Sequence, residues 1–261
     1  MTQPSIYLDT SPPVAAIVLN KPARRNALDL EMWQTLPRLL DQIEQDEEIR
    51  VGIVRGVDAR AFASGADIKE FGKIHGDPET SHDYNETVRR AARKLSRFPK
   101  PMIAMIQGPC VGGGCGIALA CDLRIADTSA RFGVPPAKLG LIYSLEDTKL
   151  LIDAVGASRA REMLFTGRLV EADEALAIGL IDRLIAAETI EAETMALAQE
   201  IAAASPFSVR HSKRIVRMIL DGASEDTLET RAVFDAAFQG ADYREGTRAF
   251  IEKRKPDFRD S

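Results

Sequence analysis

Short apolar runs recur at intervals through the first two-thirds of the chain. Residues 14–19, 51–54, 102–106 and 123–126 are each too short for a typical buried helix, and turn or loop residues bound most of them. We therefore predict four buried strands at these positions.

Helical spacing of apolar residues fills the intervals between the predicted strands. Asp29 is a predicted cap for the helix that follows it, and Pro37 inside that helix is expected to kink it. Residues 84–95 predict another helix, ended by the prolines at 99 and 101. From Ser144 onward the pattern is mostly helical, with helices expected from Ser158, from Glu171, and over residues 207–220, 224–238 and 242–254. The pattern as a whole predicts an α/β fold with a helical C-terminus.

Composition and charge narrow the classes of function. The chain has 261 residues, 28% of them charged, with a formal net charge of −5, and this acidic balance argues against a general nucleic-acid-binding protein. No stretch approaches eighteen uninterrupted apolar residues, so no membrane span is expected. The N-terminal MTQPSIYLDT lacks the basic and apolar regions of a signal peptide. We expect a cytoplasmic protein.

Three cysteines, Cys110, Cys115 and Cys121, cluster in the middle of the chain. An odd number at these spacings fits neither a disulfide framework nor a zinc motif, and no histidine lies near them. We expect small buried side chains in a reducing compartment, and no metal site.

Two loops of small residues are the candidates for chemistry. Residues 62–69 read FASGADIK, and residues 108–116 read GPCVGGGCG. Small side chains let a ligand approach the backbone closely. Consecutive glycines between a strand and a helix expose backbone N–H groups at a helix N-terminus, where a developing negative charge is favoured.

Together, FASGADIKEF and GPCVGGGCGIALACDLRIA resemble the two signature segments of the crotonase (enoyl-CoA hydratase/isomerase) superfamily. Further matches at residues 20–28, 131–140 and 250–258 extend the resemblance over nearly the whole chain. It implies a crotonase-like spiral of ββα units over residues 1–200, followed by a C-terminal helical trimerisation region over residues 201–261. It also implies a homotrimer or a dimer of trimers that acts on acyl-CoA, with coenzyme A entering as part of the substrate and no separate cofactor.

The resemblance also implies a site. The N–H groups of Ala66 and Gly113 match the family's oxyanion hole, which holds a thioester oxygen as it becomes an enolate. The residues expected to contact coenzyme A are Arg24 and Arg25 beside the nucleotide, Ala63, Ala66 and Ile68 around the adenine, and Phe234, Phe250 and Lys253 as a cover, often supplied by a neighbouring subunit.

The chain departs from the family's hydratases at both catalytic glutamates. Gly116 and Pro136 stand at those two positions, and neither residue can carry a proton. Because general acid–base groups each contribute roughly 10²–10⁴ in rate, classical hydration requires a substitute.

Three readings of the departure stay open. In the first, Glu146 or Asp147 serves as a relocated acid or base of a hydratase or isomerase, although Ser144 and Asp147 also fit a simple capping box. In the second, Tyr143 orients the carboxylate of a malonyl-type thioester, because the segment around it resembles methylmalonyl-CoA decarboxylase. That enzyme has a histidine where this chain has Ala66. In the third, the chain binds acyl-CoA without catalysis.

Overall fold

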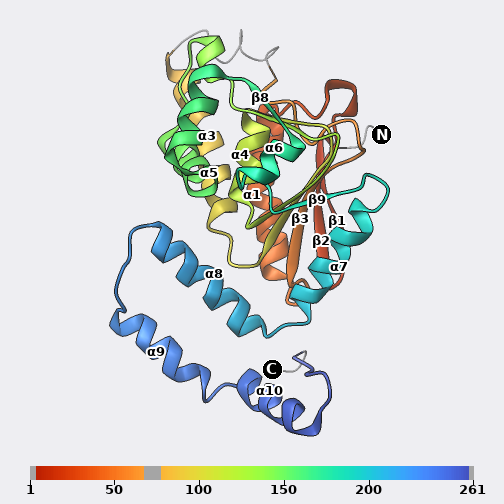
Figure 1. Ribbon diagram of the computed structural model, residues 1–261, viewed down its shortest axis with the longest axis vertical. Coiled ribbons are helices and arrows are strands. Elements are labelled where there is room, and N and C mark those ends of the chain that lie inside the picture. Colours follow the sequence, from red (N-terminus) through yellow and green to blue (C-terminus); the bar gives the residue numbers. More distant parts are fainter. Residues whose placement is uncertain (1–3, 68–77, 259–261) are drawn as a thin grey trace.

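A six-stranded sheet forms the centre of the computed structural model, which describes residues 4–67 and 78–258 (Figure 1). β1 runs antiparallel to β2, and the remaining neighbours pair in parallel. In spatial order the strands are β1 (Ile6–Ser11), β2 (Val14–Leu19), β3 (Val51–Gly56), β4 (Met102–Ile106), β6 (Leu123–Asp127) and β9 (Arg183–Ile185). The four predicted strands are all present as β2, β3, β4 and β6.

A second, smaller sheet consists of β5 (Pro109–Val111), β7 (Arg131–Gly133) and β8 (Leu169–Glu171). β5 lies within the glycine-rich loop and pairs in parallel with β7. β7 also pairs antiparallel with β8, so the glycine-rich loop is held by a paired backbone.

Helices cover both faces of the main sheet. Alternate residues of a strand point to opposite faces, so Ala15 and Ile17 join one hydrophobic core while Val14 joins a second. The first core lies under α1 (Leu30–Gln45), α3 (Pro78–Ser96), α4 (Gly113–Ala120) and α5 (Leu145–Thr166), and the second lies under α7 (Ile190–Ala202). Shorter helical turns are η1 (Pro22–Arg24), η2 (Pro136–Leu139) and α6 (Ala172–Ala177).

Local signals placed most helix starts correctly. The Asp29 side chain accepts a hydrogen bond from the Met32 N–H and caps α1, and this helix continues past Pro37 to Gln45. α5 is broken at Gly156, whose φ of 74° and ψ of 162° are not helical, so its second part begins close to Ser158, where a helix was predicted. All three cysteines are buried and free.

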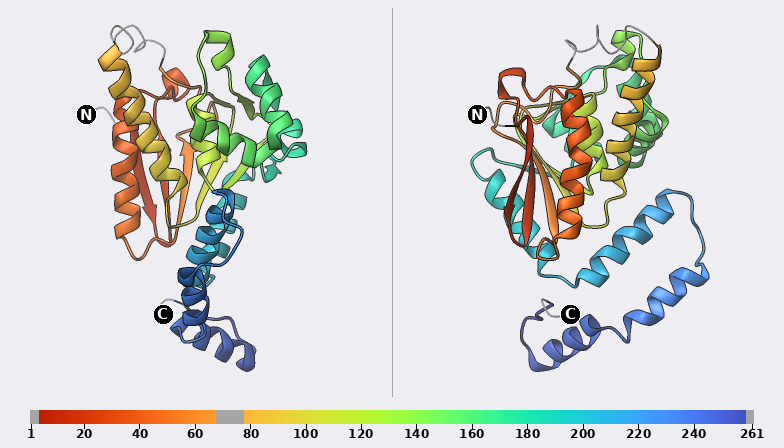
Figure 2. Two further views of the ribbon diagram at one scale, coloured as in Figure 1. Left: turned by 90° about the vertical axis from the view of Figure 1, so that its left-hand side faces the viewer. Right: turned by 180° about the vertical axis from the view of Figure 1, so that it is seen from behind.

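The last three helices form an arm beyond the amino ends of the parallel strands (Figures 1 and 2). They are α8 (Pro206–Leu220), α9 (Leu228–Ala237) and α10 (Ala241–Glu252). Arg50, just before β3, donates hydrogen bonds to the carbonyls of Ala202 (3.1 Å) and Phe258 (2.7 Å), which fixes both ends of the arm. A domain boundary at residue 200 remains a prediction. Across the part of the chain that the structure describes, every helix is too short or too polar to cross a membrane.

Candidate functional site

Backbone hydrogen bonds hold the two small-residue loops side by side. Ala63 donates to the Pro109 carbonyl at 3.0 Å, and its own carbonyl accepts from the Val111 N–H at 2.9 Å. Further along, a Cβ placed on Gly112 would lie 3.7 Å from the Gly65 Cα. The next residue of each loop, Ala66 in one and Gly113 in the other, therefore lies close to its counterpart.

The backbone N–H groups of Ala66 and Gly113 differ from their neighbours in their hydrogen bonding. The Leu28 N–H donates to the Gly65 carbonyl at 2.8 Å, and the Leu28 carbonyl accepts from the Asp67 N–H at 2.9 Å. Leu28 therefore makes no hydrogen bond to the Ala66 N–H that lies between them. Gly113 is the first residue of α4, where an N–H has no acceptor inside the helix. Neither amide has a hydrogen-bond acceptor within residues 4–67 and 78–258, and both residues are only half-buried.

Two glycines of the second loop are required by the backbone. Gly112 has φ 54° and ψ −117°, a conformation that side-chain-bearing residues rarely adopt. A Cβ on Gly114 would lie 2.5 Å from the Ala63 carbonyl oxygen, so any larger residue would push the two loops apart. The glycine run therefore serves close approach of the loops as well as exposure of the Gly113 amide.

A cluster of charges fixes the residue next to Ala66. The Asp67 carboxylate is almost fully buried and accepts hydrogen bonds from Arg24 at 2.5 Å and from Lys21 at 3.1 Å. Lys21 also donates to Asp29 at 2.6 Å. Burial lowers the pKa of Lys21, but the hydrogen bonds to Asp29 and Asp67 outweigh it, so the net pKa is raised and the ammonium stays charged.

Tyr143 and Asp147 fill the space beside Gly116. A Cβ on Gly116 would lie 3.4 Å from both the Tyr143 hydroxyl oxygen and the Asp147 Oδ1. The Tyr143 hydroxyl donates a 3.0 Å hydrogen bond to the Gly112 carbonyl, which ties it to the glycine loop. Burial is the main cause that raises the pKa of both side chains above their usual values.

Ser144 caps α5 and also holds Asp147. Its hydroxyl accepts from the Asp147 N–H at 3.0 Å and donates to the Asp147 Oδ2 at 2.6 Å. The predicted N-cap is confirmed, but the carboxylate binds the serine hydroxyl where a capping box would use the serine N–H. Pro136 begins η2 and supplies no titratable group.

The residues expected around the nucleotide have mixed environments. Arg24 is engaged with Asp67, while Arg25 is exposed and has a left-handed backbone with φ 50°. Ala63 is fully buried, so its side chain does not face a ligand in this structure. Ile68 lies outside the described residues.

The residues expected to cover coenzyme A do not approach the loops within one chain. Phe234 and Phe250 are 65% and 86% exposed, and Lys253 follows α10 on the same arm. The arm lies beyond the amino ends of the parallel strands (Figure 1). Ala66, in contrast, comes after the carboxyl end of β3, and Gly113 comes after β4 and β5. Within this chain, Phe234, Phe250 and Lys253 therefore lie away from the two loops.

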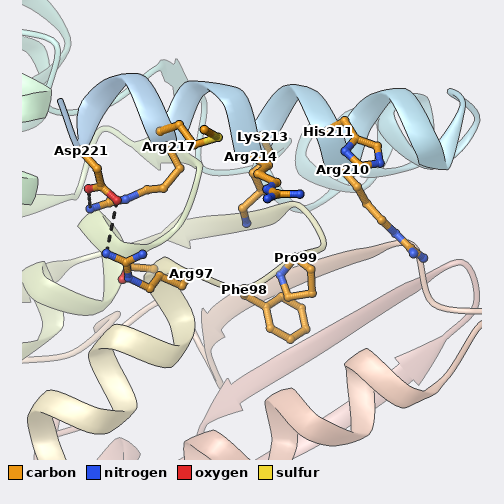
Figure 3. A pocket seen from close by; sticks show the side chains of 11 residues that line it. Arg97, Phe98, Pro99, Arg210, His211, Lys213, Arg214, Arg217 and Asp221 are labelled. Carbon is orange, nitrogen blue, oxygen red and sulfur yellow. Dashed lines mark hydrogen bonds and ion pairs between the residues drawn. The ribbon is translucent and has the colours of Figure 1, made fainter. Parts of the chain in front are cut away.

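A basic cavity of about 570 Å³ lies elsewhere, between the end of α3 and α8 (Figure 3). Arg97 and Arg217 both donate to Asp221 there, and Lys213 and Arg214 line the same wall. Pro99 places the cavity at the amino end of β4, away from the loops that follow the other end of the strand. It is therefore separate from the candidate active site.

Sequence reasoning missed two parts of the site: Lys21 with Asp67, and the Gly112 carbonyl that accepts from Tyr143. The only signal for the first was a pair of opposite charges 46 residues apart, which predicts no contact by itself. The acceptor for Tyr143 is a backbone carbonyl, which every residue has, so the sequence holds no signal for this contact.

Comparison with known proteins identifies the family of the chain. The family model described as enoyl-CoA hydratase/isomerase matches residues 9–261. The crystal structure of an enoyl-CoA hydratase/isomerase family protein from Hyphomonas neptunium superposes with a TM-score of 0.95 at 42% identity, over 97% of each chain. A Thermus thermophilus protein named as an enoyl-CoA hydratase is 37% identical over 94% of this chain and 97% of its own length. The short-chain-enoyl-CoA hydratase of Clostridium acetobutylicum is 32% identical over 96% of each. The chain belongs to the enoyl-CoA hydratase/isomerase family and has its crotonase fold.

Proposed function

We propose that the protein acts on acyl-CoA thioesters and that the Ala66 and Gly113 N–H groups together bind the thioester oxygen. The observation that carries this is the pairing of the two loops, which leaves these adjacent amides without acceptors inside the described chain. Two N–H donors aimed at one oxygen stabilise the negative charge that forms there in an enolate. Loss of one such donor costs about 10²–10³ in rate in other enzymes.

The reaction class best supported is that of the hydratases and isomerases, since the relatives carry those names. Both reactions move a proton at the carbon next to the thioester, so both need a titratable group near the oxyanion amides. With Gly116 and Pro136 at the usual positions, that group has to come from another element.

For the nucleotide, the proposal assigns Arg25 and, in part, Arg24 to the phosphates of coenzyme A. Both residues are exposed beside the loop that carries Ala66, and guanidinium groups bind phosphate oxygens in charge-assisted pairs. Arg24 would then divide its donors between Asp67 and a phosphate. Charge reversal at Arg25 should raise the dissociation constant for coenzyme A with little change in the bound-state rate.

Decarboxylation of a malonyl-type thioester is the second candidate, and the position of Tyr143 favours it. The phenol lies beside Gly116 and is tied to the Gly112 carbonyl, one residue from the Gly113 amide. Loss of CO₂ would form the same enolate without removal of a carbon-bound proton. Release of CO₂ from methylmalonyl-CoA that falls in Tyr143→Phe would support this candidate, and no release from a panel of malonyl-type thioesters would exclude it.

The proposal also includes self-association as a homotrimer or a dimer of trimers. The arm presents large apolar side chains to solvent, and patches of this kind mark protein interfaces. The most exposed are Ile219, Leu228, Phe234, Phe250 and Ile251, each at least 60% exposed. Analytical ultracentrifugation should give three or six chains per particle; a monomer at micromolar concentration would contradict it.

The direct test of the function combines binding and turnover. Calorimetric titration with crotonyl-CoA should show binding, and loss of the enone absorbance should show hydration, with 3-enoyl thioesters tested in parallel for isomerisation. Turnover of neither class, together with tight binding, would favour the non-catalytic reading. Failure to bind any acyl-CoA would reject the proposed function.

A further inference from the structure

We propose that the Asp147 carboxylate is the group that moves the proton at the carbon next to the thioester, in the place that Gly116 leaves open. This inference rests on the proposed function. It identifies one side chain for the proton transfer, and the observations that select it are its position, its hydrogen bonds and its separation from Glu146.

The position follows from the geometry of α4. Gly116 lies three residues after Gly113, and the Gly116 N–H bonds to the Gly112 carbonyl at 3.0 Å, so one helical turn of about 5 Å separates Gly116 from the oxyanion amide. Asp147 Oδ1 lies 3.4 Å from the point where a Gly116 Cβ would stand. A thioester oxygen on Gly113 therefore places its neighbouring carbon within reach of this carboxylate.

The carboxylate is held in one orientation. The Ser144 hydroxyl donates to its Oδ2 at 2.6 Å, so Oδ1 is the oxygen left to face Gly116. The three atoms nearest the Gly116 Cβ point belong to Asp147 and Tyr143, and none belongs to Glu146. Residues 143 and 147 are four apart across the start of α5, and residue 146 is turned about 100° away from 147 around the helix.

The step balances without any further reactant. The carbon–hydrogen bond next to the thioester breaks, its electron pair moves into the enolate whose oxygen the two amides hold, and the proton goes to Asp147. Return of a proton from the same carboxyl group reverses the step. In D₂O the carboxyl exchanges with solvent, so a saturated thioester should gain deuterium at that carbon.

The experiment incubates butyryl-CoA with the enzyme in D₂O and follows deuterium by mass spectrometry, with calorimetric binding of the same thioester measured separately. The wild-type protein should exchange, and Asp147→Asn should slow exchange by about 10²–10⁴ while still binding the thioester. Asp153→Asn, a carboxylate of the same helix that pairs with Lys149, is the matched control and should exchange at the wild-type rate.

Each other outcome has a distinct meaning. The assignment of Asp147 would be overturned if Asp147→Asn exchanged deuterium at the wild-type rate. It would also be overturned if Glu146→Gln lost most of the exchange rate while Asp147→Asn lost none. Wild-type protein that binds butyryl-CoA without exchange would also overturn it and would leave thioester binding intact. Wild-type protein that binds no acyl-CoA at all would reject the proposed function itself.

Discussion

The Arg24 guanidinium donates a 2.5 Å hydrogen bond to the carboxylate of Asp67, the residue after Ala66. The family resemblance places Arg24 beside the nucleotide of coenzyme A. In the structure it belongs to an ion cluster with Lys21, Asp29 and Asp67, which holds the loop that carries Ala66. The proposed contact of Arg24 with the nucleotide would therefore connect coenzyme A binding to the position of the Ala66 N–H.

Replacement of Asp67 by Asn should loosen this loop. The substitution removes the negative charge shared by Lys21 and Arg24, and hydrogen bonds to charged groups contribute about 1.5–3 kcal/mol each. We expect the free energy of unfolding in urea to fall by about 1–3 kcal/mol and kcat to fall with it. Asp58→Asn is the control, because its pair with the exposed Arg60 is screened by solvent and should contribute little to stability. Equal effects of the two substitutions would contradict the role of the cluster.

The effect of losing the Gly113 N–H donor can be separated from the effect of adding a side chain at this position. A Cβ at this position would lie 3.1 Å from Leu28 and Trp33, so both Gly113→Pro and Gly113→Ala crowd the same neighbours. Only proline removes the donor, and proline is tolerated at the first position of a helix. We expect kcat/KM of the proline variant to lie about 10²–10³ below that of the alanine variant. Similar rates in two folded variants would argue against the Gly113 donor.

Restoring a glutamate at residue 116 should not restore a classical hydratase. The Tyr143 hydroxyl and the Asp147 carboxylate already stand 3.4 Å from the Cβ position. Gly116→Ala should be close to wild type in stability. Gly116→Glu has to displace both side chains, and overpacking typically costs about 1–3 kcal/mol. Thermal unfolding and crotonyl-CoA hydration measure the two effects, and a gain of hydration in Gly116→Glu would refute this packing.

The pH dependence of activity should reflect Asp147. Burial raises the pKa of Asp147, the neighbouring Glu146 also raises it, and the Ser144 hydrogen bond lowers it; the phenol of Tyr143 also lies beside it. If Asp147 must be ionised, the acid limb of kcat/KM should lie above the pKa of an exposed aspartate. Ser144→Ala should move that limb to higher pH, since it deletes the one hydrogen bond that favours the charged form. If the acid limb of kcat/KM stayed at the same pH in Ser144→Ala, the Ser144 hydrogen bond would not control the ionisation of Asp147.

The same pKa shift has a consequence for stability. A carboxyl whose pKa is higher in the folded than in the unfolded state stabilises the fold at low pH, and this contribution is lost as pH rises through the folded-state pKa. Asp147→Asn should therefore be more stable than the wild type near neutral pH and lose that advantage in acid. Urea unfolding at a series of pH values measures the difference; a variant less stable at neutral pH would contradict the shift.

Local patterns predicted much of the fold. Strands β2 and β4 have the predicted bounds, and the Asp29 and Ser144 caps are where their residue types indicated. β5, β7 and β8 were missed because each has three residues and depends on pairing with remote segments. Such strands carry too few positions for a period of two to appear in the sequence.

The candidate site was predicted less completely. The resemblance pointed to Ala66 and Gly113, but only coordinates show the bonds of Ala63 that place the two loops together. Ala63 is buried because the glycine-rich loop pairs with it. The type of residue at position 63 does not predict this burial. The choice of Asp147 over Glu146 depends on the angular position of each residue on α5, which shifts with the start of the helix.

The most direct measurement of the central claim is the infrared frequency of a ¹³C-labelled thioester carbonyl in crotonyl-CoA bound to the protein. Hydrogen bonds from Ala66 and Gly113 should lower the carbonyl stretch below its value in water, and the displacement should shrink in Gly113→Pro but persist in Gly113→Ala. A bound carbonyl with the same frequency as in water, unchanged in the proline variant, would contradict the account.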